Sequence, residues 1–151
     1  MNILYIWDAD YPWDVRVEKI CLTLAQNGHS VHIAARNLKR LAEREFIKDL
    51  VIHRIHPWKN NFINYTWSFP AFFSPIWRHF INRIIRENSI DLIIIRDLPL
   101  AIAAIWAGKK YHIPVILDMA ENYVAMIRAI WKNRKFEGLN FIVRNPYLAR
   151  Y

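Results

Sequence analysis

The chain has 151 residues, and its 21 lysine and arginine residues against 13 aspartate and glutamate residues give a formal net charge of +8. This length suits one domain and is too short for two domains of ordinary size. Because 54% of the residues are hydrophobic and 23% are charged, the chain can bury a core, which excludes a disordered tail. The single Cys21 excludes a disulfide framework and a cysteine-based zinc site, and we expect its thiol to be buried.

Short apolar runs alternate with helical patterns, which is typical of an α/β protein with a parallel sheet. Five strands are predicted, at Asn2 to Trp7, Ser30 to Ala35, Val51 to Ile55, Asp91 to Ile95 and Ile113 to Leu117. The run Leu92-Ile93-Ile94-Ile95 is apolar on both faces, as expected for a strand that helices cover on each side.

The helices are predicted between these strands. The first spans Asp14 to Asn27, with Asp14 as N-cap and Gly28 just after the last turn. The second runs from about Pro75 to Glu87, and the third, which we expect to be buried, runs from Pro99 to Tyr111. Helical patterns resume after Asp118 through Trp131, and again over residues 139–151. The chain ends without a helix-stop signal, so we expect it to be the front part of a longer protein.

The segment 58–77 interrupts this alternation with an aromatic-rich insertion. Loops of this length in compact domains are usually functional. Two interpretations stay open: the aromatic residues fold back onto the core, or they contact a membrane or a lipid-linked acceptor. The residues that would make the lipid contact are Trp67, Phe72, Phe73, Trp77 and Arg78.

No apolar run reaches the about 18 residues that a membrane-spanning helix needs, and the N-terminus lacks the basic region of a signal peptide. We therefore expect a cytoplasmic protein, with peripheral contact to the inner face of the membrane as an open possibility.

Polar residues follow the predicted strands, at the edge where parallel α/β sheets bind their ligands. Charged groups directly after buried strands are costly unless they are paired or used, so a polar site is expected there. An ion pair between Arg96 and Asp118 would account for part of it without any function. The candidate site residues are Asp14, Arg16, Arg96, Asp118, Glu121 and Asn122.

Several familiar sites are excluded. The dinucleotide fingerprint Gly-x-Gly-x-x-Gly and the Walker A loop are both absent. Asp8-Ala9-Asp10 resembles the aspartate pair of haloacid dehalogenase phosphatases, but Tyr11-Pro12 follows it and no later aspartate pair completes a metal site. The six histidines lack ligand spacing, so we expect structural roles for them and no metal site. The basic residues are scattered, which argues against nucleic acid as a partner.

The residues from Pro12 to Lys19, followed by Gly28-His29-Ser30-Val31, resemble the opening of a glycosyltransferase family 4 enzyme of the GT-B class. In that family an "Arg-Val" helix ends at "Gly-His-x-Val" before the second strand. The segments Asp91 to Asp97 and Ile113 to Asp118 agree with the fourth and fifth strands of the family. The ordered set covers nearly the whole chain.

The resemblance implies a Rossmann-like, doubly wound parallel sheet over residues 1–151 that holds chiefly the acceptor. It also implies a retaining transfer from a nucleotide-sugar, with no cofactor and no bound metal. The donor is gripped by a second Rossmann-like domain, which we expect downstream or in a partner subunit, so we expect this chain alone to be inactive as a hexosyltransferase. Two features depart from the family: no glycine follows the first strand, and Ala120 stands where relatives carry a histidine near the donor sugar.

On this interpretation Arg16 and Arg96 bind diphosphate or acceptor anions, and Asp14 and Asp118 orient them. Glu121 and Asn122 contact sugar hydroxyls, or else cap the following helix. The competing interpretation is a non-enzymatic Rossmann-like module that binds an anionic membrane surface or a partner protein.

Overall fold

The computed structural model describes residues 1–12, 14–56 and 74–119. In chain order the elements are β1 (Asn2–Asp10), α1 (Val15–Gln26), β2 (Ser30–Arg36), β3 (Arg44–Ile47), β4 (Leu50–Arg54), α3 (Pro75–Asn88), β5 (Leu92–Arg96), α4 (Ala101–Tyr111) and β6 (Val115–Asp118). All of them lie in the first of two compact units, Met1–Asp118. The helices expected beyond Asp118 lie outside the described residues, and the prediction of one domain over 1–151 stays a prediction.

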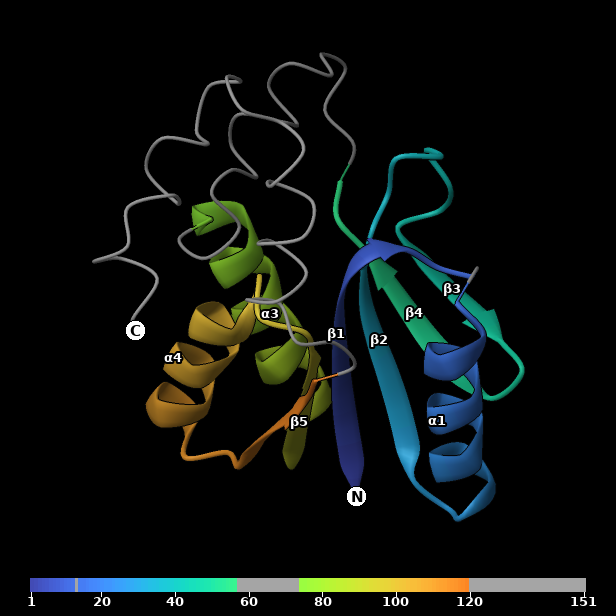
Figure 1. Cartoon of the computed structure of the whole chain (residues 1–151). Helices are drawn as coiled ribbons and strands as arrows, with labels where there is room; N and C mark the ends of the chain where they lie inside the picture. Colours follow the sequence, from blue (N-terminus) through green and yellow to red (C-terminus); the bar gives the residue numbers. More distant parts are fainter. Residues whose placement is uncertain (13, 57–73, 120–151) are drawn as a thin grey trace, which may run out of the picture. The chain divides into compact units, whose positions relative to one another are not determined.

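The six strands form one sheet in the order β3-β4-β2-β1-β5-β6 (Figure 1). All neighbouring pairs are parallel except β3 with β4. The chain builds outward from β1 through β2 to β4 and then crosses to β5 on the other side of β1, so the strand order reverses between β1 and β5. This is the doubly wound arrangement that the resemblance implies, and it confirms the predicted fold class.

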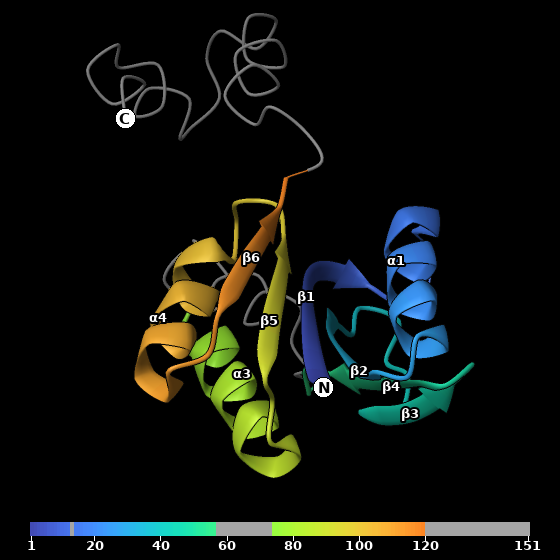
Figure 2. The same ribbon diagram turned by 90° about the horizontal axis from the view of Figure 1, so that it is seen from below.

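Helices cover both faces of the sheet (Figures 1 and 2). One face of β1 and β2 packs with Val17 and Cys21 of α1 in one apolar cluster. The opposite face of β1 and β5 packs against α3 and α4 in a second cluster. The burial of Cys21 confirms the expectation for its thiol, and burial raises the pKa of that thiol to about 12.

The ends of α1 are set by local chemistry, as the sequence predicts. The carboxylate of Asp14 accepts hydrogen bonds from the backbone N–H groups of Arg16 at 2.8 Å and Val17 at 3.1 Å, which satisfies two amides of the first turn. Gly28 follows the last turn with φ of +81°, a conformation that glycine adopts without strain.

Strand β3 was not predicted, because its four residues carry little apolar pattern. It forms a hairpin with β4 through Lys48 and Asp49, which both have positive φ, the backbone of a tight two-residue turn. Such turns are usually signalled by Asn-Gly or Asp-Gly, and Lys-Asp is no such signal. Phe46 on β3 is 72% exposed, so burial does not mark this strand either.

Trp77 was predicted to contact the membrane, and the structure corrects this. Its side chain is fully buried in the cluster beneath α3 and lies edge-on to Phe80, with ring centroids 5.8 Å apart. A side chain in this position packs the core and has no surface for lipid. No helix of the described segments is long and apolar enough to cross a membrane.

Gly108 marks the closest approach between α4 and the start of β6. A Cβ at this position would lie 2.8 Å from the backbone oxygen of Ile113 and closer still to the side chain of Val115. Replacing a glycine inside a helix by alanine normally stabilises the helix by about 1 kcal/mol. Here the crowding of about 1–3 kcal/mol should reverse the sign.

We therefore expect Gly108→Ala to lower the free energy of unfolding by up to about 2 kcal/mol, as measured by urea denaturation of the chain. Lys109→Ala, at the exposed neighbouring position, is the matched control and should change it by less than about 0.5 kcal/mol. A Gly108→Ala chain that is more stable than the wild type would show that no close approach exists here.

His32 on β2 and His53 on β4 form a buried pair on neighbouring strands of the sheet. Nδ1 of His32 lies 3.0 Å from Nε2 of His53, and the two rings stack with centroids 5.3 Å apart. Burial, followed by the neighbouring His32, Arg44 and Arg83, lowers the pKa of His53 to about 4, and burial and Arg44 also lower the pKa of His32. Both rings are buried, and the structural role expected for the histidines stays a prediction.

This pair makes folding stability depend on pH. The ordinary pKa of histidine, near 6.5, applies to His53 in the unfolded chain. Below that pH the unfolded chain binds a proton at His53, whereas the folded chain does not until the pH approaches 4. Stability should therefore be complete above about pH 6.5 and fall by on the order of 3 kcal/mol as the pH drops to about 4. Urea denaturation across this range should show a shallower pH dependence for His53→Leu than for the wild type. Equal pH dependence in both would contradict a titrating His53.

Candidate functional site

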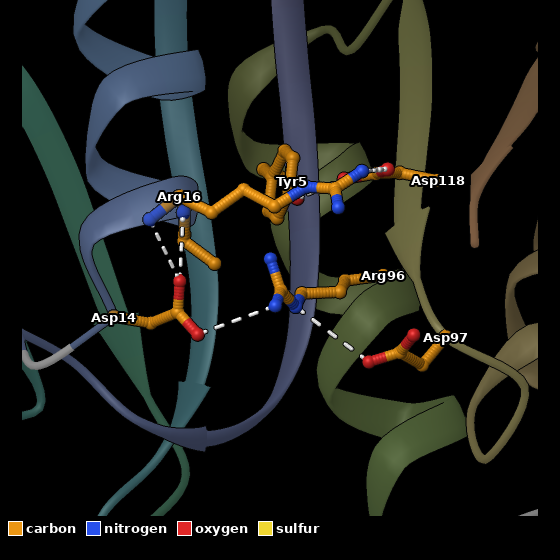
Figure 3. Close-up of polar contacts among 7 residues, drawn as sticks. Tyr5, Asp14, Arg16, Arg96, Asp97 and Asp118 are labelled. Carbon is orange, nitrogen blue, oxygen red and sulfur yellow. Dashed lines mark hydrogen bonds and ion pairs between the residues drawn. The ribbon is translucent and has the colours of Figure 1, made fainter. Parts of the chain in front are cut away.

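Polar side chains gather where the strand order reverses, at the carboxyl ends of β1, β5 and β6 and at the start of α1 (Figure 3). Arg96 ends β5, Asp118 ends β6, and Asp14 and Arg16 begin α1. Figure 3 shows these side chains directed toward one another on the side of the sheet that α1 covers. We call Tyr5, Asp14, Arg16, Arg96, Asp97 and Asp118 the switch-edge cluster.

Asp118 is held from two directions. Nη2 of Arg16 contacts its Oδ1 at 2.6 Å, and the hydroxyl of Tyr5 donates a hydrogen bond to its Oδ2 at 2.9 Å. Burial, and then the adjacent carboxylate of Asp118, raises the pKa of Tyr5 above its ordinary value, so the phenol keeps its proton and stays a donor. The carboxylate of Asp118 is thereby fixed in orientation.

Arg96 lies between two other carboxylates. Its Nη2 is 3.3 Å from Oδ2 of Asp14, and its Nε is 3.6 Å from Oδ2 of Asp97. The Arg96 side chain is only 11% exposed, and its buried Nη1 has no hydrogen-bond partner in the part of the chain that the structure describes. A buried N–H donor without a partner costs about 1–3 kcal/mol, so Nη1 is a donor of this cluster whose hydrogen bond is not made among the described residues.

The pairing differs from the ion pair that the sequence suggested. Arg96 was considered as the partner of Asp118, but Arg16 contacts Asp118 and Arg96 contacts Asp14 and Asp97. The side chain of Arg16 extends from the first turn of α1 across the sheet edge to the end of β6, a contact that strand ends alone do not reveal. The cluster thus brings together four of the six predicted site residues.

The other predicted residues are placed differently. Glu121, Asn122, Trp67, Phe72 and Phe73 lie outside the described residues. Arg78 is exposed on α3, where its guanidinium lies 4.0 Å from the ring centroid of Trp106 on α4.

Two residues that hold this edge together, Tyr5 and Arg54, were not predicted from the sequence. Tyr5 stands in an apolar strand, and its one signal is that a buried hydroxyl needs a partner. Arg54, at the end of β4, is 1% exposed and binds Glu45 at 2.8 Å. It also donates to the backbone oxygens of Ala42 at 2.8 Å and Tyr11 at 3.2 Å. Arg54 therefore anchors the segment that connects β1 to α1, which carries Asp14.

A second polar group lies at the ends of β1 and β2. Nε of Arg36 contacts Oδ1 of Asp8 at 2.6 Å, and burial raises the pKa of Asp8 while Arg36 opposes that rise. Asp10 accepts hydrogen bonds from the backbone N–H groups of Leu38 and Lys39. These bonds fix the loops around the edge. Across residues 1–12, 14–56 and 74–119 no three His, Cys, Asp or Glu side chains are grouped as a metal site would require.

Comparisons with known proteins agree with this architecture. The model of Glycosyltransferase Family 4 matches residues 14–119, more than two thirds of the chain. Among solved structures the chain is similar to the glycosyltransferase SnogD from Streptomyces nogalater, with a TM-score of 0.59 and 16% identity over 99% of this chain and 38% of that one.

The chain is also similar to sucrose-phosphate synthase from Thermosynechococcus elongatus, with a TM-score of 0.61 and 11% identity over 94% of this chain and 38% of that one. The comparison with the C-terminal domain of a hydrogenase from Pyrococcus furiosus gives a TM-score of 0.50 and 15% identity, over 78% of this chain and 89% of that one. At these identities the structures support the fold alone. The chain spans 38% of the length of each of the first two proteins. No curated protein sequence matches it.

Proposed function

This chain belongs to glycosyltransferase family 4, and from that membership we propose that it is the N-terminal, acceptor-side domain of a retaining hexosyltransferase. The enzyme would transfer a sugar from a nucleotide-sugar donor to an acceptor hydroxyl. One observation supports the proposal: the switch-edge cluster holds Nη1 of Arg96, a donor without a partner among the described residues, at the place where doubly wound sheets bind ligands.

The charge of the cluster favours an acceptor over a diphosphate. Three carboxylates, from Asp14, Asp97 and Asp118, stand beside the two guanidinium groups of Arg16 and Arg96. Both arginines are already paired, so the cluster carries no excess positive charge for a diphosphate. Paired donors and acceptors of this kind match hydroxyl groups, which both donate and accept hydrogen bonds. We therefore assign these arginines to the hydroxyl groups of an acceptor, whereas the sequence had suggested a diphosphate or an acceptor anion.

In this proposal the chain binds and orients the acceptor, while the donor is held elsewhere. Transfer forms a bond between the acceptor oxygen and the anomeric carbon of the donor sugar. The bond from that carbon to the nucleoside diphosphate breaks, and the acceptor hydroxyl loses its proton as the diphosphate leaves. Donor binding is assigned to a C-terminal domain or a partner subunit, in keeping with the 38% of the relatives' length that this chain spans. No resident cofactor or metal is part of the proposal.

The proposal is tested by incubating the native gene product with radiolabelled UDP-glucose, UDP-galactose and GDP-mannose, using methyl hexosides and a lipid extract as acceptors. Label should pass from one donor to one acceptor class. The chain of residues 1–151 by itself should transfer nothing and should gain activity when its donor domain is supplied. If the native product and the supplemented chain both fail with every donor, the alternative of a non-enzymatic binding module is favoured.

A further inference from the structure

Helix α4 is apolar on two sides. Toward the sheet it presents small residues that are buried, including Ala103, Ala104 and Ala107. On the opposite side Ile105 is 44% exposed and Trp106 is 40% exposed. A surface helix normally carries polar residues on its outer face, and one that is apolar all round usually has something covering both sides.

Basic residues surround this exposed apolar face. Lys109 and Lys110 continue it over the last turn of α4 and are exposed. The guanidinium of Arg78 on α3 lies over the ring of Trp106, at 4.0 Å from its centroid. Together α3 and α4 contain five lysine or arginine residues and a single acidic residue, Glu87. The surface that the two helices share is therefore both apolar and cationic.

We propose that the α3–α4 surface, formed by Arg78, Ile105, Trp106, Lys109 and Lys110, docks onto an anionic lipid bilayer. Tryptophan favours the headgroup level, where its ring is apolar and its N–H stays near water. Isoleucine beside it can enter the acyl boundary, and lysine stems can bury their methylenes while their ammonium groups meet lipid phosphates. The surface meets these needs with charges complementary to an anionic leaflet.

Of the residues for which the sequence suggested lipid contact, only Arg78 belongs to this surface as defined. Trp77 is in the core, and α4 was expected from the sequence to be buried, so the sequence did not indicate the part of the surface that α4 contributes. The proposal goes beyond the transferase activity and does not depend on it, because docking can be measured without any sugar transfer.

The test is flotation of the native gene product with vesicles of phosphatidylcholine alone and with vesicles that also contain phosphatidylglycerol. We expect binding to the anionic vesicles and little binding to the neutral ones. Lys109→Glu combined with Lys110→Glu should lower the partition coefficient by at least about tenfold, since each basic residue near an anionic surface adds to the attraction. Trp106→Ala should lower it by at least about threefold.

Phe46→Ala is the matched control, because Phe46 is an exposed aromatic side chain on β3, at the opposite edge of the sheet. It should leave binding unchanged. Circular dichroism melting of each variant separates lost binding from lost folding, and Lys109→Ala with Lys110→Ala serves if the glutamate variant unfolds. The proposal is overturned if anionic vesicles bind no better than neutral ones, or if folded α4 variants bind as well as the wild type. Sugar transfer to a methyl hexoside, assayed in parallel, shows whether the proposed function stands when docking fails.

Discussion

Replacing Trp77 by alanine should lower the free energy of unfolding by about 3–5 kcal/mol, the range for deleting a large aromatic side chain from a core. Trp77 is fully buried against Phe80 in the cluster that joins α3 and α4 to the sheet, so its removal leaves a cavity that rigid neighbours fill only in part. Domains are stable by about 5–15 kcal/mol, so this one change should remove a large share of the total. Urea denaturation followed by circular dichroism measures the loss.

Trp106→Ala gives the comparison within the same residue type. Trp106 is 40% exposed on α4, so the same deletion should cost less than about 2 kcal/mol. If the two variants lost equal stability, or if Trp77→Ala were within about 1 kcal/mol of the wild type, the assignment of Trp77 to the core would be wrong. The prediction that it contacts lipid would then have to be reconsidered.

The second large effect is expected from Arg96→Met, which should lower kcat/KM of the native gene product by about 10- to 100-fold. Hydrogen bonds made by a charged group contribute about 1.5–3 kcal/mol, which corresponds to that range. Methionine keeps much of the aliphatic stem but removes every donor, including the buried Nη1, and it removes the cation that contacts Oδ2 of Asp14. Initial-rate measurements on the active donor and acceptor pair give the ratio.

Two further variants show what the loss means. Arg96→Lys keeps the positive charge but lacks the planar guanidinium group with its several N–H donors. Its kcat/KM should therefore fall between those of the Arg96→Met variant and the wild type. Arg86→Met removes an exposed arginine in the last turn of α3, outside the switch-edge cluster, and should change kcat/KM by less than about twofold. Equal activity of the Arg86 and Arg96 variants would remove Arg96 from the site.

Local signals made much of the fold predictable. Asp14 and Gly28 mark the ends of α1 because capping depends on a few neighbouring residues. The apolar run of β5 also identified a strand inside the sheet, because a strand covered by helices on both faces is apolar along its length. The local signal was weak at the Lys48–Asp49 turn of the β3–β4 hairpin, so the residue pattern did not predict β3.

Errors arose where the outcome depends on which face a residue takes. Trp77 stands in an aromatic run, and the run suggested a surface, but its spacing to Ile81 and Ile84 places it on the buried face of α3. The helix period was therefore the better guide at this boundary.

The candidate site was predictable by region more than by contact. The rule that ligands bind at the carboxyl ends of parallel strands named Asp14, Arg16, Arg96 and Asp118, and the structure places these four in one cluster. The pairing among them depends on side-chain reach across the sheet edge, so the sequence suggested the wrong partner for Arg96. The role of Tyr5 depends on a hydrogen bond to a residue 113 positions away, which no local pattern encodes.

The measurement that tests the central claim most directly is the pair of KM values in the Arg96→Met protein, with donor and acceptor varied independently. If the switch-edge cluster binds the acceptor, the acceptor KM should rise by at least about tenfold while the donor KM stays within about twofold of the wild type. A raised donor KM with an unchanged acceptor KM would contradict the account, and it would assign this cluster to the diphosphate of the donor instead.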